Sequence, residues 1–262
     1  MLVAVEAPSG SCAKGRALTK LAKRNSKKEK SHPWRMCPAG EHWVVTHPRH
    51  VTPSKKNPKG VTIVEGHCRD NPSRKDQIYP EEIQKIALKH FNKLKYLPVS
   101  DNLDRKKGND YDKLIAGWTK FWNEVLKTDE SLDLNLVKAL VKTESEFKEK
   151  AKNRAGKRNW ARGLMQLTDE TIKILKDEKG ELKDFLVNID QNDANDPNLN
   201  ICAGIRWLFH KKKLLEHKLH RKVSWEEAVM EYKSYTRDLK MGKNRAMEQR
   251  DKFLELYKRL QR

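Results

Sequence analysis

The sequence has no long apolar run and no basic, apolar leader. None of its 262 residues lies in a stretch close to the roughly 18–20 apolar residues that a membrane-spanning helix needs. The first residues have no basic lead, and their apolar character ends at Glu6. We therefore expect neither an integral membrane protein nor a secretory signal peptide. Synthesis in the cytoplasm, followed by export through lysis or a dedicated secretion machine, is the expected route.

Acidic residues are scarce relative to basic ones. The chain has 36 aspartates and glutamates against 56 lysines and arginines, a net charge of +20. Residues 1–75 carry +11 of this charge, and the longer remainder carries +9. Such an excess predicts anionic partners: nucleic acid, an anionic cell envelope or a membrane surface. The hydrophobic share, 37%, is low but too high for a fully disordered chain.

Cysteine is also scarce. Four residues, with no C-x-x-C pair, are spread along the chain: Cys12, Cys37, Cys68 and Cys202. A chain of this length can bury a core without disulfides. The spacing therefore predicts four reduced thiols and no disulfide scaffold.

The pattern divides the chain into three parts. Residues 1–32 are predicted to be a basic flexible tail. Residues 33–77 are predicted to form a small β-rich module. Within it, 42–47 and 61–64 are rich in β-formers and are separated by turn residues, which favours a hairpin.

The β-rich module contains cysteines, histidines and an internal echo. One six-residue pattern recurs twenty residues later: Val44-x-x-His47-x-Arg49 and Val64-x-x-His67-x-Arg69. Cys37, His47, His67 and Cys68 are candidate zinc ligands by residue type. Their spacing fits no standard finger, and neighbouring residues of a strand point to opposite faces. A hairpin with exposed histidines is the favoured interpretation.

Residues 78–262 are predicted to be helical. Apolar residues recur at helical spacing over several segments: about 80–91, 111–125, 133–149, 169–177, from Pro197 onward, from Ser224 onward and 244–260. Ser224-x-x-Glu227 is a capping box, in which side chains and backbone satisfy each other's donors at a helix start. The fold class is therefore mainly α, with a small β-hairpin module in front.

Glu144 occupies an unusual position in the segment 133–149. Val137, Leu140 and Val141 share one helical face, and Glu144 is the next residue on that stripe. Desolvation of a carboxyl group at such a position raises its pKa, as a general acid at neutral pH requires. The alternative is a structural glutamate at the helix edge, paired with a lysine.

Four motifs follow one another in the helical part. They are Glu144-Ser145, Gly163-Leu-Met-Gln166, Asn200-x-x-x-Gly204 and Ala228-Val-Met-Glu-Tyr232. Together they resemble the soluble lytic transglycosylase domain, whose lysozyme-like fold is shared with goose-type lysozyme. The resemblance covers about residues 110–260 and implies a lysozyme-like helical catalytic domain.

The resemblance also implies roles for individual residues. Glu144 would be the catalytic acid, and Tyr232 would hydrogen-bond and orient it. The substrate-binding positions would be Ser145, Gly163, Met165, Gln166 and Tyr232; Met165 is equally suited to core packing and Ser145 to ending the helix. Two segments depart from the family: Lys233-Ser-Tyr235 replaces asparagine and small residues, and 153–162 is bulky and basic.

The implied activity is cleavage of the β-1,4 bond between N-acetylmuramic acid and N-acetylglucosamine in peptidoglycan. The family uses one glutamate and the substrate's own N-acetyl group, and leaves 1,6-anhydromuramic ends without a cofactor. A lysozyme-type hydrolase of the same fold is an alternative, with Asp169, Glu170, Asp193 or Glu231 as its second carboxylate. Glu146 lies two positions from Glu144 and is expected on the other side of the helix. A basic nucleic-acid-binding protein and a catalytically inactive wall-binding module are further alternatives.

The expected partners follow from the same resemblance. They are peptidoglycan glycan strands and the anionic envelope, to which the basic charge would tether the enzyme. A wall-cleaving enzyme without a signal peptide suggests a phage lysis or virion protein, or a secreted effector, acting in the periplasm or cell wall. A secretion or virion carrier and an immunity protein would then be further partners, by fold-level analogy alone.

Overall fold

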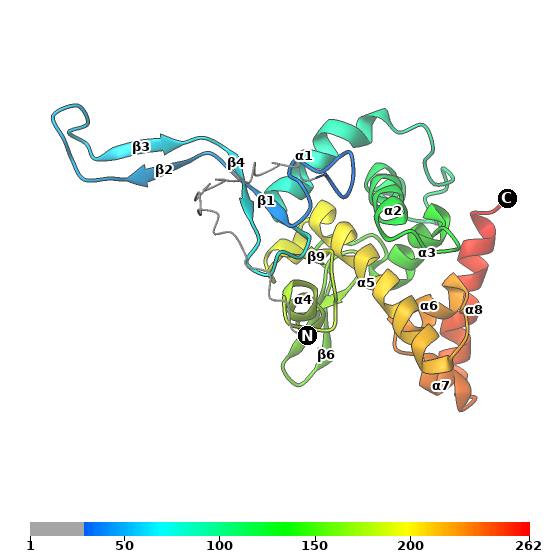
Figure 1. Cartoon of the computed structure of the whole chain (residues 1–262). Helices are drawn as coiled ribbons and strands as arrows, with labels where there is room; N and C mark the ends of the chain where they lie inside the picture. Colours follow the sequence, from blue (N-terminus) through cyan, green and yellow to red (C-terminus); the bar gives the residue numbers. More distant parts are fainter. Residues whose placement is uncertain (1–28) are drawn as a thin grey trace, which may run out of the picture.

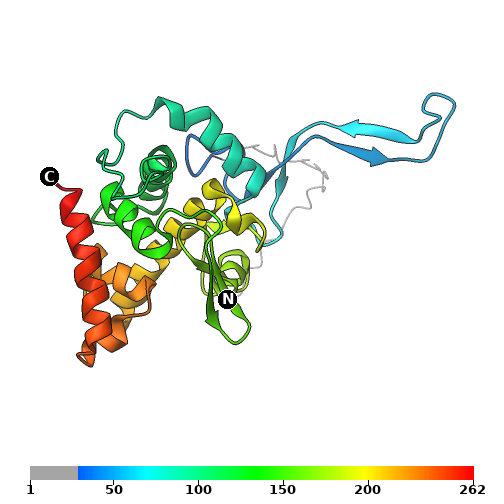
Figure 2. The same cartoon turned by 180° about the vertical axis from the view of Figure 1, so that it is seen from behind.

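The computed structural model describes residues 29–262. Cys12 and all but the end of the predicted tail therefore lie outside the described residues. The chain folds into a helical body, from which a two-stranded hairpin projects (Figures 1 and 2). No helix among the described residues is both long and apolar enough to cross a membrane.

Helices form most of the body, which confirms the predicted fold class. They are α1 (Pro80–His90), α2 (Asp112–Leu126), α3 (Leu134–Ser145), α4 (Asp169–Lys176), α5 (Pro197–Leu219), α6 (Trp225–Tyr232), α7 (Thr236–Lys240) and α8 (Asn244–Arg259), with the short 3-10 turns η1 (Phe91–Lys93) and η2 (Asp193–Asn195).

Local sequence explains where several helices begin and end. The side chains of Asp133, Thr168 and Asp196 accept hydrogen bonds from backbone N–H groups at the starts of α3, α4 and α5. Both bonds of the Ser224 capping box are present at the start of α6, as predicted. The helix predicted over 133–149 is shorter than expected, because the chain turns left-handed at Glu146, with φ 52°.

Nine short strands accompany the helices in the described part of the chain. β1 (Glu41–Val44) pairs with β4 (His67–Asp70), and β2 (His47–His50) pairs with β3 (Val61–Val64). β6 (Lys152–Gly156), β7 (Asn159–Arg162) and β8 (Leu167–Thr168) form a second antiparallel sheet. β5 (Gln77–Ile78) pairs in parallel with β9 (Leu186–Val187). The first two pairs form the predicted hairpin.

The internal echo corresponds to the two sides of this hairpin. Val44 lies opposite His67, and His47 lies opposite Val64, so each valine faces the histidine of the other copy. Each histidine ring also contacts the carbonyl oxygen two residues before it, at 2.9 Å. The repeat therefore encodes matching positions on two antiparallel strands.

The base of the hairpin contains a disulfide between Cys37 and Cys68, with an S–S distance of 2.08 Å. The prediction of reduced thiols is wrong for this pair, because folding brings residues 31 positions apart together. Cys202 is a buried free thiol. With its sulfur atoms bonded to each other, the pair offers no thiolate to zinc. The described residues contain no group of three or more His, Cys, Asp or Glu placed to hold a metal ion.

The start of the predicted β-module is built into the helical body. Arg35 is buried and binds Asp76 (Nη1–Oδ1, 2.5 Å) and Glu82 of α1 (Nε–Oε1, 2.8 Å). It also donates to the carbonyl oxygen of Gln77 at 2.7 Å. His32, placed in the flexible tail by the sequence pattern, is buried, and its ring lies 4.6 Å from that of Phe121.

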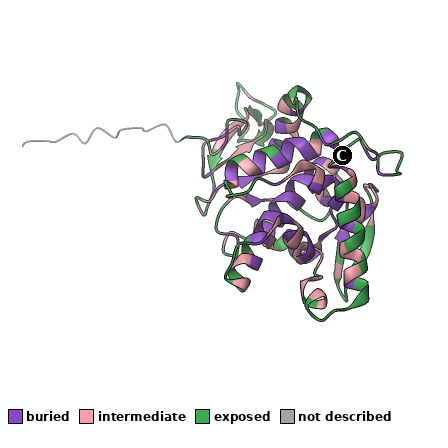
Figure 3. Ribbon diagram, turned by 90° about the vertical axis from the view of Figure 1, so that its right-hand side faces the viewer, coloured by how far each residue is buried: buried purple, intermediate pink, exposed green. Residues whose placement is uncertain are grey.

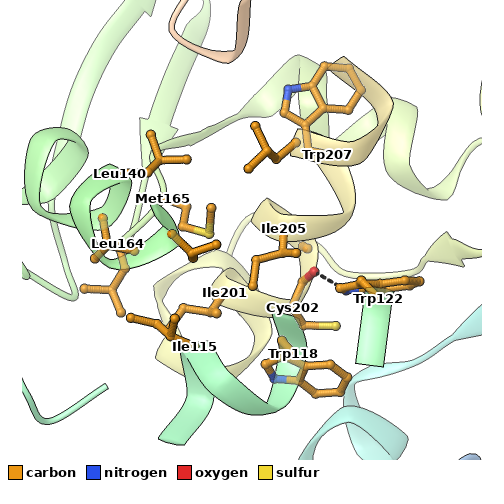
Figure 4. Packing of buried hydrophobic residues seen from close by; sticks show 14 of the residues in the cluster. Ile115, Trp118, Trp122, Leu140, Leu164, Met165, Ile201, Cys202, Ile205 and Trp207 are labelled. Atoms are coloured by element: carbon orange, nitrogen blue, oxygen red, sulfur yellow. Dashed lines mark hydrogen bonds between the residues drawn. The ribbon is translucent and has the colours of Figure 1, made fainter. Parts of the chain in front are cut away.

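The core surrounds α5, which contacts α1, α2, α4 and α6. Buried residues concentrate on these interior helices (Figure 3). Figure 4 shows the contact between α2 and α5, where the indole N–H of Trp122 donates to the carbonyl oxygen of Cys202 at 2.9 Å. Trp118 donates in the same way to the side chain of Asn198 at 2.7 Å. These bonds satisfy the polar ends of two large aromatic side chains in the core.

Candidate active site

Glu144 lies in the last turn of α3, at the edge of the core. Val137, Leu140 and Val141 of the same stripe are fully buried, as the spacing predicts. The Glu144 side chain itself is 15% exposed. The helix thus ends with a carboxylate that is mostly withdrawn from solvent but still reachable.

The closest partner of this carboxylate is Lys233, which follows the last residue of α6. Its Nζ lies 2.6 Å from Glu144 Oε1, and its side chain is 5% exposed. Nζ also donates to the hydroxyl of Thr143 at 3.3 Å. Glu144 is therefore paired with a lysine, as the structural alternative expected, while keeping the position that a catalytic acid needs.

Tyr232 does not hold Glu144 in the way that the resemblance implied. Its hydroxyl donates to the carbonyl oxygen of Met165 at 2.6 Å. A phenol has only one O–H to donate, so Lys233 is the residue that donates to the carboxylate. Burial raises the pKa of Tyr232 well above its usual value, and the nearby charge of Glu144 adds to that effect. The tyrosine is thus a neutral neighbour of the acid.

The turn 163–166 joins β7 to β8 and contacts this site through the bond between Met165 and Tyr232. Gly163 has φ 74°, and a Cβ there would lie 2.3 Å from the carbonyl oxygen of Ala194, so only glycine fits. Asn200 of α5 secures the turn with its side-chain amide. It donates to the carbonyl oxygens of Arg162 and Ala194 and accepts from the backbone N–H of Met165 at 2.7 Å.

Three predicted substrate-binding residues are used by the fold itself. The Met165 side chain is buried in the core against Gly204 rather than facing a substrate (Figure 4). Gln166 is also buried, and its amide bonds Asn153 and the carbonyl oxygens of Ala151 and Gly163. Ser145 donates to a carbonyl oxygen one turn earlier in α3. These three residues therefore shape the surroundings of Glu144 instead of offering free polar groups.

Most of the carboxylates suggested for a hydrolase have other partners. Glu146 points away from Glu144 and pairs with Arg105. Asp169 binds Arg162 at 3.0 Å, and Glu170 accepts from Asn159 at 3.1 Å. Asp193 accepts from the backbone N–H of Asp190 at 2.8 Å. Among the described residues, none of these four shares a hydrogen-bond partner with Glu144.

A family model, the transglycosylase SLT domain, matches residues 122–254 of the chain. This is just over half of its length and includes Glu144, the turn at Gly163, Asn200 and Lys233. The chain belongs to this family. Searches of curated proteins and of solved structures gave no match. The SLT domain is a lysozyme-like helical fold associated with lytic transglycosylase cleavage of peptidoglycan.

The SLT domain of this chain has a basic hairpin, β6–β7, that is bonded to the turn 163–166 through Asn153 and Gln166. β6 and β7 carry exposed Lys152 and Trp160, with the lysine Nζ 4.8 Å from the indole ring. Sequence reasoning recognised this stretch and Lys233 as departures from the family but assigned neither a role. Only the folded chain, which brings the residue after α6 to the last turn of α3, reveals the contact between Lys233 and Glu144, because 89 residues separate them.

Proposed function

We propose that this protein is a lytic transglycosylase in which Glu144 is the single catalytic carboxylate. It cleaves the β-1,4 bond between N-acetylmuramic acid and N-acetylglucosamine and leaves 1,6-anhydromuramic ends. The observation that carries the proposal is the position of Glu144, 15% exposed at the end of a buried stripe within a matched SLT domain. A carboxyl group in such surroundings can act as acid and then as base.

The proposed chemistry needs only one carboxyl group. Glu144 protonates the glycosidic oxygen while the N-acetyl group of the substrate assists departure. The resulting carboxylate takes the proton from the C6 hydroxyl of the muramic acid as that oxygen attacks the anomeric carbon. No water is consumed. Four other carboxylates are bonded to residues that do not contact Glu144, which supports this route over one with a second carboxylate. They are Glu146, Asp169, Glu170 and Asp193.

A lysozyme-type hydrolase is the second candidate, because the fold is shared. In the part of the chain that the structure describes, the Glu231 side chain has no hydrogen-bond or ion-pair partner that would exclude it as a second carboxylate. Mass spectrometry of digested sacculi distinguishes the two reactions. Anhydromuropeptides are expected as products. Reducing ends without anhydromuropeptides would assign the hydrolase reaction instead.

Glu144→Gln tests the catalytic assignment. We expect turnover of sacculi to fall by about 10²–10⁴-fold, the usual contribution of a general acid or base. Glu146→Gln is the matched control, since this carboxylate lies two positions away, is exposed and pairs with Arg105. Full activity in a folded Glu144→Gln variant, or equal losses in both variants, would refute the assignment.

We also propose that the protein acts at the cell envelope. The Cys37–Cys68 disulfide supports a compartment more oxidising than the cytoplasm. The net charge of +20 supports attraction to the phosphate and carboxylate groups of an envelope. Binding to sacculi that weakens as salt is raised is the expected result, and binding insensitive to salt would contradict the role of charge.

A further inference from the structure

Two other buried ammonium groups in the described body, those of Lys138 and Lys212, provide a comparison for Lys233. Lys138 Nζ contacts the carbonyl oxygen of Val99, the side-chain oxygen of Asn109 and the carboxylate of Asp112, all within 3.0 Å. Lys212 is buried between Glu216 and the carbonyl oxygen of Val223. An ammonium has three N–H donors, and the three acceptors of Lys138 satisfy all of them.

Lys233 is held less completely than Lys138, and it has two acceptors, as Lys212 does. Its side chain is 5% exposed, yet among the described residues its Nζ has only Glu144 Oε1 at 2.6 Å and the Thr143 hydroxyl at 3.3 Å. One of its three N–H donors therefore has no acceptor among residues 29–262. Its one short contact is with the proposed catalytic carboxylate.

The carboxylate side of this pair is also incomplete. Within residues 29–262, Lys233 is the only hydrogen-bond partner of Glu144, through Oε1, so Oε2 remains available to a substrate. The other titratable group facing the pair is Tyr232, which is neutral and donates to Met165. The turn 163–166 brings no charged residue to this place. The proton balance of the site therefore depends on Glu144 and Lys233 alone.

We propose that Lys233 is a positioning residue that stores the proton used by Glu144. With water present, the pair is an ammonium and a carboxylate. When a glycan covers the site and removes that water, two neutral groups cost less than two charges. The proton then passes from Lys233 Nζ to the Glu144 carboxylate across the 2.6 Å contact, leaving a neutral amine and a carboxylic acid.

The proton count closes over one reaction cycle, given the function proposed above. Glu144 gives the proton to the glycosidic oxygen as the bond from that oxygen to C1 breaks, with the bonding electrons leaving on the oxygen. The Glu144 carboxylate then takes a proton from the C6 hydroxyl as its oxygen bonds to C1. When the product leaves and water returns, that proton passes back to Lys233. No external acid or base is consumed.

The proposal predicts how activity depends on pH. In the wild type the proton is held within the Lys233–Glu144 pair and is not drawn from solvent, so activity should persist above neutral pH. Without Lys233, Glu144 must take its proton from solvent, and only acidic conditions supply it. Lys233→Met should therefore retain activity at acidic pH and lose at least about tenfold at pH 8, a loss within the range of general acid–base catalysis.

Lys233→Arg separates proton storage from charge. A guanidinium keeps the positive charge but does not release its proton at any relevant pH. This variant should be poorly active from pH 4 to 10. Lys148→Met is the matched control. Lys148 is exposed, lies just beyond the end of α3, the helix that contains Glu144, and pairs with Glu146. Circular dichroism and thermal unfolding verify that each variant is folded.

The measurement is the pH profile of kcat on purified sacculi. Three results would each overturn the proposal: wild-type activity in Lys233→Arg, an unchanged profile in Lys233→Met, or faster turnover by Lys233→Met at every pH. The last would show that the ion pair restrains the acid. If Glu144→Gln is inactive while the Lys233→Met profile is unchanged, only this inference fails. An active Glu144→Gln removes the proposed function itself.

Discussion

The helical body and the outer hairpin β2–β3 are held in place by different forces. In the body, apolar side chains such as Leu140 are fully buried around α5. In the hairpin, Ile63 is 59% exposed, and Val51 and Val61 are exposed as well. The hairpin therefore depends on its backbone ladder and on its attachment to the body. Only the body is large enough to withdraw polar groups from water, and the candidate active site around Glu144 lies there.

Arg35 holds the start of the segment that leads into the hairpin against the helical body, and its removal should have the largest effect on stability. Arg35→Met leaves two buried carboxylates, Asp76 and Glu82, without their cation. We expect the free energy of unfolding to fall by about 3–5 kcal/mol, measured by urea denaturation. Arg250→Met is the control, since Arg250 and its partner Asp251 are exposed, and a change within about 0.5 kcal/mol is expected. Similar losses in both variants would mean that the buried network is not a special anchor.

A matched pair of truncations compares the regions directly. Leu140→Ala should cost about 2–5 kcal/mol, because it opens a cavity beneath the end of α3. Ile63→Ala should change the free energy of unfolding by no more than about 0.5 kcal/mol, since its side chain is mainly in solvent. Urea titrations of both variants check the difference. A large loss at Ile63 would show that the hairpin packs against something in solution.

The smallest expected effect is at the C-terminal end of α8. Partial burial raises the pKa of Asp101, but hydrogen bonds from Arg259 outweigh this and hold that pKa below its usual 3.8. The same arginine lowers the pKa of Asp104. Because the folded-state values are depressed, this contribution to stability is complete above pH 3.8 and is lost as pH falls below it.

Thermal unfolding of wild type and Arg259→Met at pH 7 and pH 3 measures this contribution. The wild-type Tm should decrease slightly more on acidification than that of the variant, because the variant has already lost the ion pairs. Equal decreases in the two proteins would show that these exposed contacts contribute nothing.

Sequence patterns predicted the structure well where a feature depends only on residues close together in the chain. The Ser224 capping box and the apolar stripe before Glu144 were both predicted, because short-range geometry alone determines them. The echo around His47 and His67 indicated a regular feature, but not that its copies face each other across a hairpin. The end of α3 was placed too late, since no local signal marked the left-handed turn at Glu146.

Long-range pairings were not predictable in the same way. The Cys37–Cys68 disulfide and the buried position of Arg35 depend on segments that meet only after folding. The motif predicted Gln166 and Met165 as substrate contacts. In the fold, the Gln166 amide bonds to Asn153, and the Met165 side chain packs against Gly204. A motif identifies residues of a site without saying which of their atoms remain free.

The sequence by itself determined that the chain is basic and mainly helical, and that Glu144 ends an apolar stripe. These properties follow from composition and from spacing along one element. Only the tertiary structure decided which group faces that carboxylate. It placed Lys233 at 2.6 Å and turned the Tyr232 hydroxyl toward Met165. The reason is physical: the partner of a buried charge is set by packing between helices far apart in the chain, and no local pattern encodes it.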